Sequence, residues 1–312
     1  MLATVLAIVA PLFGLVLLGF VAGRRRWLPE GSTPVLNAFV VYLAVPALFL
    51  KVIIDSDPHE LWQPGFLLAF SIGAAAAFTL ALLVDRKRHR RLSEASIDGL
   101  IAAYPNTGYL GIPLCLAAFG HTGLQAALIA CVIPVTIVFV VAIIALEFDI
   151  HYGHGMTKAV TNTVIRLVTN PLLIAPTVGV AWNLAGFGLP EPGHKLLELL
   201  GDAAVPCALV NIGTFLSESP AGGHDRAGWL VAIKLLVQPA VTALVALVVL
   251  KMDPVWSSAA ILLAALPTGT GPFMLATHYQ FDSALSARAI LVSTILSVAT
   301  LTVLLLLLHP AA

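Results

Sequence analysis

The sequence predicts an all-α, polytopic membrane protein whose ten transmembrane helices form two inverted repeats of five. Three observations predict this class. The 312 residues are 59% hydrophobic and only 10% charged, with a mean hydropathy of +0.99, which is too apolar for a soluble domain of this length. Apolar runs long enough to cross a bilayer recur along the whole chain. Short motifs of the first half also return, in the same order, in the second half.

The expected spans lie at residues 3–22, 34–54, 64–84, 96–119, 122–146, 160–185, 194–217, 227–250, 256–278 and 284–308. Each holds roughly the 20 residues that a helix needs to cross the hydrocarbon core. The first run has basic residues after it rather than before it, which predicts a permanent span and not a cleaved signal peptide. The three cysteines lie inside apolar runs without metal-ligand spacing, so we expect neither a metal site nor a disulfide.

Basic residues are unevenly distributed between alternate loops. Three consecutive arginines begin at Arg24 after the first span, and five basic residues lie between Arg86 and Arg91 after the third. The loops after the fifth and seventh spans add Lys158 and Arg226. The positive-inside rule makes these loops cytoplasmic, so both termini should lie outside. The net charge of zero gives no indication of a nucleic-acid partner.

The second half of the chain repeats landmarks of the first half. The matching pairs are Pro11-Leu12 with Pro171-Leu172, and Ala44-Val45-Pro46 with Ala204-Val205-Pro206. Each half holds five spans, and an odd number means that the second half must enter the membrane from the opposite side. We therefore expect two inverted repeats, residues 1–150 and 151–312, which meet in the polar segment 147–158.

A further pair of repeated motifs interrupts the fourth and ninth spans. They read Tyr104-Pro105-Asn106-Thr107-Gly108 and Pro267-Thr268-Gly269-Thr270-Gly271. Proline removes a helix hydrogen bond and glycine relaxes the backbone, so both spans should unwind there. The exposed backbone groups cannot face lipid and must face protein or a wet cavity. We expect the two breaks to cross at the bilayer midplane, as is typical of binding sites in transporters.

The predicted pocket suits a small organic anion, in particular a carboxylate. Two half-helix N-termini would point their positive ends into it, while amide and hydroxyl side chains would add uncharged donors. The candidate substrate-binding residues are Pro105, Asn106, Thr107, Gly108, Pro267, Thr268, Gly269, Thr270 and Gly271. The alternative is a pair of kinks that serves packing alone, with the threonine hydroxyls bonded back to their own helices.

Charged residues inside the spans are candidates for charge or proton coupling, and they are Lys234, Asp202 and Asp98. Two have simpler interpretations. Lys234, like Arg166 and Arg288, would extend its ammonium group to the membrane surface, and Asp98 would be a first-turn acid that stabilises the helix dipole. No carboxylate adjoins either break, so a sodium cage is not evident. Protease, hydrolase and nucleotide-binding motifs are absent from the sequence, which predicts no catalytic residues, cofactor or metal.

Several segments resemble the auxin efflux carrier family over nearly the whole chain. These segments are Leu36 to Val40 with Pro46-Ala47-Leu48, Asn106 to Leu114, Lys234-Leu235 with Pro239, and Ser293-Thr294 with Leu296-Ser297. The resemblance implies the fold of bile acid symporters and sodium/proton antiporters. In that fold the first, second, sixth and seventh spans form a scaffold, and the third to fifth and eighth to tenth spans form a transport domain. It also implies elevator-type movement, dimerisation through the scaffold and a place in a bacterial inner membrane. Plant members carry indole acetate, and bacterial members are associated with malonate, malate or related carboxylates.

The family's asparagine and crossing prolines map onto Asn106, Pro105 and Pro267, whereas Thr268 and Thr270 stand where a second amide is expected. The predicted pocket is therefore asymmetric. These features predict a secondary transporter that moves a small organic anion across the cytoplasmic membrane by elevator-type alternating access. Two alternatives stay open. One is a membrane sensor that binds a ligand at the same crossing without transport, and the other is an anion channel.

Overall fold

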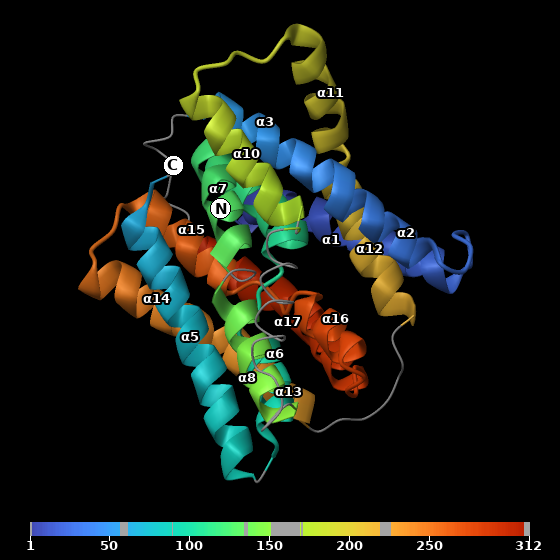
Figure 1. The fold of residues 1–312 in the computed structure, drawn as a ribbon, viewed down its shortest axis with the longest axis vertical. Coiled ribbons are helices and arrows are strands. Elements are labelled where there is room, and N and C mark those ends of the chain that lie inside the picture. Colours follow the sequence, from blue (N-terminus) through green and yellow to red (C-terminus); the bar gives the residue numbers. More distant parts are fainter. Residues whose placement is uncertain are drawn as a thin grey trace.

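The computed structural model describes residues 2–56, 62–88, 90–133, 137–150, 169, 171–218 and 226–308. Every regular element in these ranges is helical, apart from one isolated β-bridge (Figure 1). The α-helices are α1 (Leu2–Arg24), α2 (Ser32–Phe39), α3 (Val45–Asp55), α5 (Pro64–Lys87), α6 (Leu92–Ala103), α7 (Ile112–Ile133), α8 (Phe139–Ile150), α10 (Pro171–Leu184), α11 (Glu191–Asp202), α12 (Ala204–Glu218), α13 (Arg226–Ala232), α14 (Gln238–Ala243), α15 (Pro254–Ala264), α16 (Gly271–His278) and α17 (Ala284–Leu308). Short π-helical turns join several of them.

Seven helical stretches of the described chain are long and apolar enough to cross a membrane. They are Val5–Arg24, Ser32–Asp55, Pro64–Lys87, Thr107–Val132, Glu191–Glu218, Arg226–Val249 and Ala284–Leu308. This agrees with a polytopic membrane protein. The number is smaller than the ten predicted spans because the ninth is divided into the short helices α15 and α16. The fourth is likewise divided, and parts of the fifth and sixth lie outside the described residues.

The stretch Thr107–Val132 changes direction at Gly120, whose backbone angles (φ 61°, ψ −143°) are not helical. A positive φ is strained for residues with a Cβ atom and is readily adopted by glycine. Gly120 therefore separates two helices that follow each other directly. The sequence placed the boundary between the fourth and fifth spans at residues 120–121, which is where the turn lies.

Three of the π-helical turns precede prolines that lie inside long helices. The turns η1 (Val40–Ala44), η2 (Thr107–Gly111) and η4 (Ile233–Val237) each end two residues before a proline, at Pro46, Pro113 and Pro239. Proline lacks the N–H that the regular hydrogen-bond ladder needs, and its ring clashes with a carbonyl one turn earlier. A local widening of the helix accommodates that mismatch, so these helices continue past their prolines.

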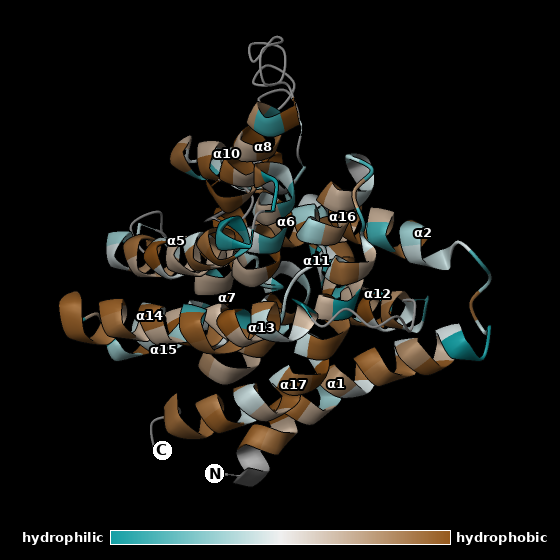
Figure 2. Ribbon diagram, turned by 90° about the horizontal axis from the view of Figure 1, so that it is seen from below, coloured by the Kyte–Doolittle hydropathy of each residue, from teal (hydrophilic) through white to brown (hydrophobic). Residues whose placement is uncertain are grey.

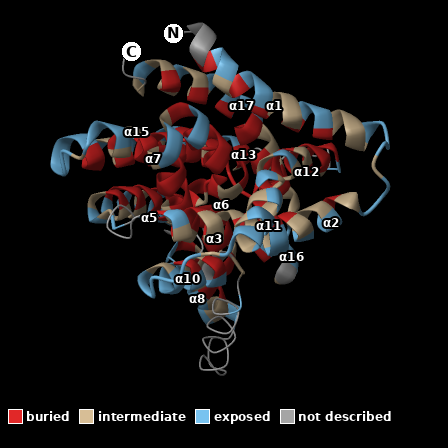
Figure 3. Ribbon diagram, turned by 90° about the horizontal axis from the view of Figure 1, so that it is seen from above, coloured by how far each residue is buried: buried red, intermediate tan, exposed pale blue. Residues whose placement is uncertain are grey.

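Two sets of helices pack closely. In the first set, α1 lies along α12, and α3 packs against α10 and α11. In the second set, α5 packs against α6 and α14, α6 packs against α8, and α7 packs against α15. Figure 3 shows the buried residues gathered where α6, α7, α12 and α13 pass through the middle of the molecule. Figure 2 shows hydrophobic residues along most of α1, α14 and α17. Large apolar side chains such as Leu17, Leu68 and Ile295 are exposed on outer faces, as expected where lipid takes the place of protein.

The contact between α1 and α12 is backbone to backbone. A Cβ atom at Gly213 would lie 2.0 Å from the Val16 carbonyl oxygen, and one at Gly19 would lie 2.2 Å from the Val210 carbonyl oxygen. Small residues at such positions allow membrane helices to approach closely and gain dispersion contacts. These glycines therefore fix the separation of α1 and α12.

Candidate functional site

The two interrupted helices meet through their backbones. Pro105 and Thr268 form an antiparallel bridge. The Asn106 N–H donates to the Pro267 carbonyl oxygen at 2.8 Å, and the Gly269 N–H donates to the Tyr104 carbonyl oxygen at 2.9 Å. Each break thus satisfies backbone groups of the other, which would otherwise be unpaired in an apolar environment. The structure brings together the two motifs that the sequence singled out.

Thr268 helps to hold the crossing together. Its side chain is fully buried, and its hydroxyl donates to the Ile101 carbonyl oxygen at 3.0 Å, near the end of α6. Its backbone N–H donates to the Ser293 hydroxyl of α17, also at 3.0 Å. The hydroxyl therefore bonds across to the other broken helix and not back to its own, and it is already engaged in the described structure.

Two glycines of the second break make room for an aromatic ring. A Cβ atom at Gly269 would lie 3.0 Å from the Tyr104 ring, and one at Gly271 would lie 2.8 Å from it. Both distances are shorter than ordinary van der Waals contact. The absence of a Cβ atom at Gly269 and Gly271 thus leaves space for the Tyr104 ring, whereas a Cβ atom at Gly108 would meet only the Cys131 sulfur, at 4.0 Å.

Both polar side chains of the first break are buried. Asn106 is 6% exposed, and its side-chain amide makes no hydrogen bond within the part of the chain that the structure describes. Its backbone carbonyl accepts from the N–H groups of Leu110 and Gly111. The neighbouring Thr107 is also buried. The Asn106 amide therefore keeps its donors and its acceptor without partners among the described residues.

A cavity of about 360 Å³ lies where α2 and α12 face η2, α16 and α17. It is lined by Thr33, Pro34, Asn37, Tyr109, Asn211, Ile212, Phe215, Glu218, Thr270, Phe273, Met274 and Ala287. The volume and the mainly apolar lining with a few polar groups are typical of small-molecule sites. Of the predicted substrate-binding residues, Thr270 lines this cavity, and the other eight lie outside its lining.

Polar contacts cross this cavity between α2 and the elements around it. The Tyr109 hydroxyl donates to Asn37 Oδ1 at 2.5 Å, and the Thr33 hydroxyl donates to Glu218 Oε1 at 2.8 Å. Asn211 is buried, and its Oδ1 has no hydrogen-bond donor among the described residues. The sequence analysis did not select these residues as site residues. The sequence held features that could have identified them. Asn37 and Tyr109 lie in the segments that carry the family resemblance, and Asn211 is an amide within an apolar span.

Lys234 is buried deep in the protein. Its side chain has no exposed surface, and Nζ donates to the Ala264 carbonyl oxygen, the last residue of α15, at 2.7 Å. The interpretation of Lys234 as a residue that reaches the membrane surface is therefore wrong. Its Nζ lies at the C-terminal end of α15, where the helix dipole is negative, just before the second break.

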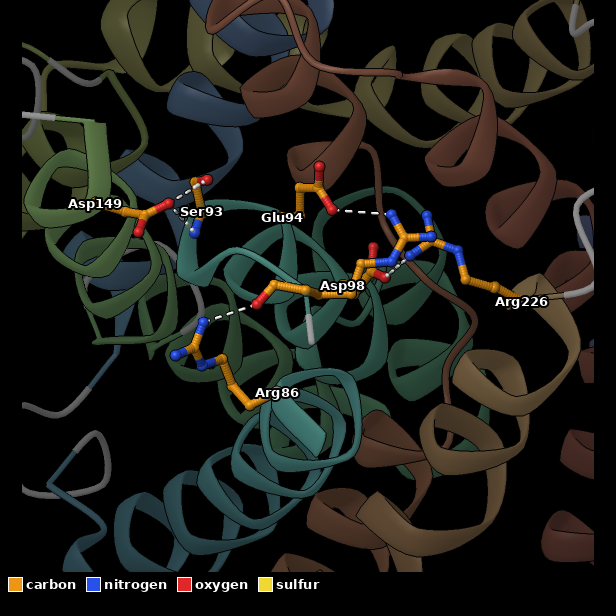
Figure 4. A network of polar contacts seen from close by, with 7 residues as sticks. Arg86, Ser93, Glu94, Asp98, Asp149 and Arg226 are labelled. Carbon is orange, nitrogen blue, oxygen red and sulfur yellow. Dashed lines mark hydrogen bonds and ion pairs between the residues drawn. The ribbon is translucent and has the colours of Figure 1, made fainter. Parts of the chain in front are cut away.

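The two candidate aspartates occupy different environments. Asp98 is 3% exposed and accepts a hydrogen bond from Arg226 Nη1 at 2.8 Å (Figure 4). It is the seventh residue of α6, whose first-turn acid is Glu94, so the first-turn interpretation of Asp98 is wrong. Asp202 is exposed at the end of α11. Within the described ranges, no group of three His, Cys, Asp or Glu residues is arranged to hold a metal ion.

Comparison with known proteins decides the family. A family model described as "Membrane transport protein" matches residues 4–305. The chain belongs to the auxin efflux carrier family of membrane transport proteins. This auxin efflux carrier family member is 33% identical, over 99% of its length and 98% of the relative's, to a Rhizobium meliloti protein named "Putative malonate transporter". It is 22% identical, over 95% of both chains, to auxin efflux carrier component 8 of Arabidopsis thaliana. It is 29% identical to an uncharacterized transporter of Methanothermobacter thermautotrophicus over 92% of this chain and 93% of that one.

The comparisons also settle the broad class of activity. Both the family and these relatives are transporters and not enzymes. The auxin efflux carrier family resemblance that the sequence indicated is therefore confirmed, together with a multi-pass membrane protein that carries out transport.

Proposed function

We propose that this protein is a secondary transporter for a small carboxylate, bound where the two broken helices cross. The observation that carries the proposal is the pair of backbone hydrogen bonds that holds the breaks together beside an amide side chain with unused donors. Uncharged donors and helix dipoles favour a carboxylate without holding it permanently. The name of the Rhizobium relative, which refers to malonate, supports the same class of substrate.

The binding site extends from Asn106 and Thr107 through the second break, Pro267 to Gly271, to Thr270 in the cavity wall. The carboxylate would accept from the Asn106 amide and from the Thr270 hydroxyl. The apolar side chains of Phe215, Phe273 and Met274 would cover the rest of the ligand. Glu218 is exposed and already accepts from Thr33, so the anion would bind toward the crossing and away from that carboxylate.

The transport mechanism in this proposal is an elevator-type movement of one group of helices against another. The repeats 1–150 and 151–312 are inverted. The scaffold comprises α1, α2 with α3, α10, and α11 with α12, and the transport domain comprises the other helices. The close packing of α1 on α12 and of α3 on α10 and α11 supports this division. The cavity supports it as well, because it lies between α2 and α12 of the scaffold and η2, α16 and α17 of the transport domain. We also propose a homodimer joined through the scaffold in a bacterial inner membrane, with both termini outside.

Charge coupling in this proposal involves Lys234, Asp98 and Asp202. Lys234 donates to Ala264, the last residue of α15 before the second break, so gain or loss of a proton at Nζ would act on the anion-binding region. Asp98 is connected to α13 through Arg226. Asp202, on the scaffold, is exposed and would act from the surface.

Reconstitution into proteoliposomes tests the proposal. We expect saturable uptake of mono- or dicarboxylates and counterflow, in which unlabelled substrate inside the vesicles accelerates entry of labelled substrate. Currents measured at two pH values would show whether protons move with the anion. Flux that does not saturate and shows no counterflow would identify a channel. Carboxylate-induced thermal stabilisation without accumulation would identify a sensor, and a response limited to cations would contradict anion binding.

Replacing Tyr109 with phenylalanine should alter the transport rate with little effect on stability. The hydroxyl donates to Asn37 across the proposed boundary between transport domain and scaffold. Its loss removes about 0.5–1.5 kcal/mol of stabilisation from the described conformation and leaves the other conformations of the transport cycle unaffected. We expect a change of roughly two- to tenfold in the exchange rate, measured by counterflow, and an almost unchanged Tm. Tyr42→Phe is the matched control because Tyr42 is exposed. Equal rates for both variants and the wild type would exclude a role for the Tyr109 hydroxyl.

A further inference from the structure

We propose that Asn211 determines substrate selectivity by accepting a hydrogen bond from a hydroxyl group of the bound carboxylate. The inference rests on the proposed function, because it narrows the class of ligand that the same cavity takes. The substrate would be a carboxylate that carries an uncharged hydrogen-bond donor beside its charged group, and the cavity would discriminate against the analogue that lacks this donor.

Asn211 is a buried amide with an unused acceptor. It lies in α12, within the apolar stretch Glu191–Glu218. It is 4% exposed, and its Oδ1 has no donor among the described residues. The Thr214 hydroxyl, one turn along the helix, donates to the backbone carbonyl oxygen of Asn211 at 2.9 Å and not to its side chain. A buried acceptor that has lost its water without gaining a donor is unfavourable, so a partner for Oδ1 is expected.

The amide stands in the wall of the cavity. Asn211, Phe215 and Glu218 all line it from α12, and their spacing of four and three residues places them on one face of the helix. That face is turned toward α2 and η2, against which α12 packs. Within a membrane-spanning segment, a polar side chain that borders a cavity commonly marks the path of a ligand.

Two other hydroxyl groups of the wall already have acceptors. The Tyr109 hydroxyl donates to Asn37, and the Thr33 hydroxyl donates to Glu218. A hydroxyl group has a single proton to donate, so neither can serve Asn211 in this arrangement. The donor that Oδ1 lacks would therefore come from the molecule that fills the cavity.

The chemistry of the wall indicates which kind of donor fits. The amide of Asn211 is neutral, and a hydroxyl group can be transferred to such a place at a lower cost than a charged ammonium group. Thr270, on the far side of the cavity, precedes α16 and would bind the carboxylate. A ligand with both groups would thus bridge α12 of the proposed scaffold and the second break of the proposed transport domain.

Selectivity follows from the cost of leaving Oδ1 unpaired. A carboxylate without the hydroxyl group would fill the cavity and exclude water, yet give the amide no donor. Sites built to bond a substrate hydroxyl reject the analogue that lacks it for this reason. The amide would therefore act on the choice of ligand, whereas the crossing would hold the carboxylate that both ligands share.

Isothermal titration calorimetry of the purified full-length protein tests the inference without transport. The probes are pairs of carboxylates that differ by one hydroxyl group: hydroxymalonate with malonate, lactate with propionate, and 3-hydroxybutyrate with butyrate. In the wild type, we expect the hydroxylated member of at least one pair to bind roughly five- to a hundredfold more tightly. Asn211→Leu keeps the approximate shape and removes the acceptor, so this ratio should fall to about one while the Tm is unchanged or higher.

Ser217→Ala is the control on the same helix. The Ser217 hydroxyl bonds back to the Thr214 carbonyl oxygen, and Ser217 is not part of the cavity lining, so this variant should keep the wild-type ratio. Equal affinities for both members of every pair in the wild type would overturn the inference. A ratio that survives in Asn211→Leu would overturn it as well.

A second measurement uses the wild type alone and covers the case in which Asn211→Leu fails to fold. Fluorine is similar in size to a hydroxyl group but cannot donate, so the fluoro analogue of the preferred probe should bind as weakly as the compound without the hydroxyl. A fluoro analogue that binds as tightly as the hydroxy acid would exclude the donor role. Saturable carboxylate transport without any preference for the hydroxyl group would contradict this inference alone, whereas a wild type that binds no carboxylate would overturn the proposed function and the inference with it.

Discussion

Replacing Asn106 with alanine is expected to abolish carboxylate uptake and counterflow in proteoliposomes while the protein still folds. The amide is buried at the crossing and makes no hydrogen bond within the described chain, so its donors are available to a bound anion. Hydrogen bonds to a charged group contribute about 1.5–3 kcal/mol. Their loss would weaken the affinity roughly ten- to a hundredfold, so the site would stay largely empty at the substrate concentrations used in the assay. Alanine keeps the backbone N–H that donates to Pro267, so the crossing should persist.

The experiment needs a measure of folding beside the transport assay. Thermal unfolding in detergent should give nearly the same Tm for Asn106→Ala and the wild type. Thr302→Ala is a suitable control, because this exposed hydroxyl on α17 bonds back to its own helix at Val298 and should leave transport unchanged. Undiminished transport by Asn106→Ala would remove the crossing as the binding site.

Replacing Gly213 with alanine should strongly destabilise the protein. The added methyl group would lie 2.0 Å from the Val16 carbonyl oxygen and 2.5 Å from the Phe20 backbone nitrogen. Both are backbone atoms, so no rotamer change relieves the clash, and α1 and α12 must separate. Overpacking typically costs about 1–3 kcal/mol, and occasionally more, and we expect a clear fall in Tm together with reduced transport.

Gly14→Ala is the matched control for this prediction. Gly14 also lies in α1, but a Cβ atom there would meet nothing within 4 Å. Alanine favours the helix over glycine by about 1 kcal/mol, so Gly14→Ala should leave the Tm unchanged or raise it. Equal falls in Tm for both variants would show that the close contact at Gly213 is not the cause.

The sequence predicted the features that depend on local chemistry. Pro105 and Pro267 lie at the breaks because proline cannot continue a regular helix, and the turn at Gly120 coincides with a predicted boundary between spans. The features that it missed depend on partners far away in the chain. Tyr109 meets Asn37, and Thr268 meets Ile101, only after folding. Lys234 and Asp98 both had interpretations based on nearby helix ends, and both were wrong because their actual partners, Ala264 and Arg226, come from other helices.

The backbone pairing at the crossing has a consequence for engineering. The bonds between Asn106 and Pro267 and between Gly269 and Tyr104 use main-chain atoms alone, so they do not depend on which side chain stands at position 106 or 270. If the proposed site is correct, substrate selectivity can therefore be changed without disturbing the backbone architecture of the crossing. Libraries that vary these two positions while keeping the prolines and Gly269 should yield folded carriers with altered substrate preference.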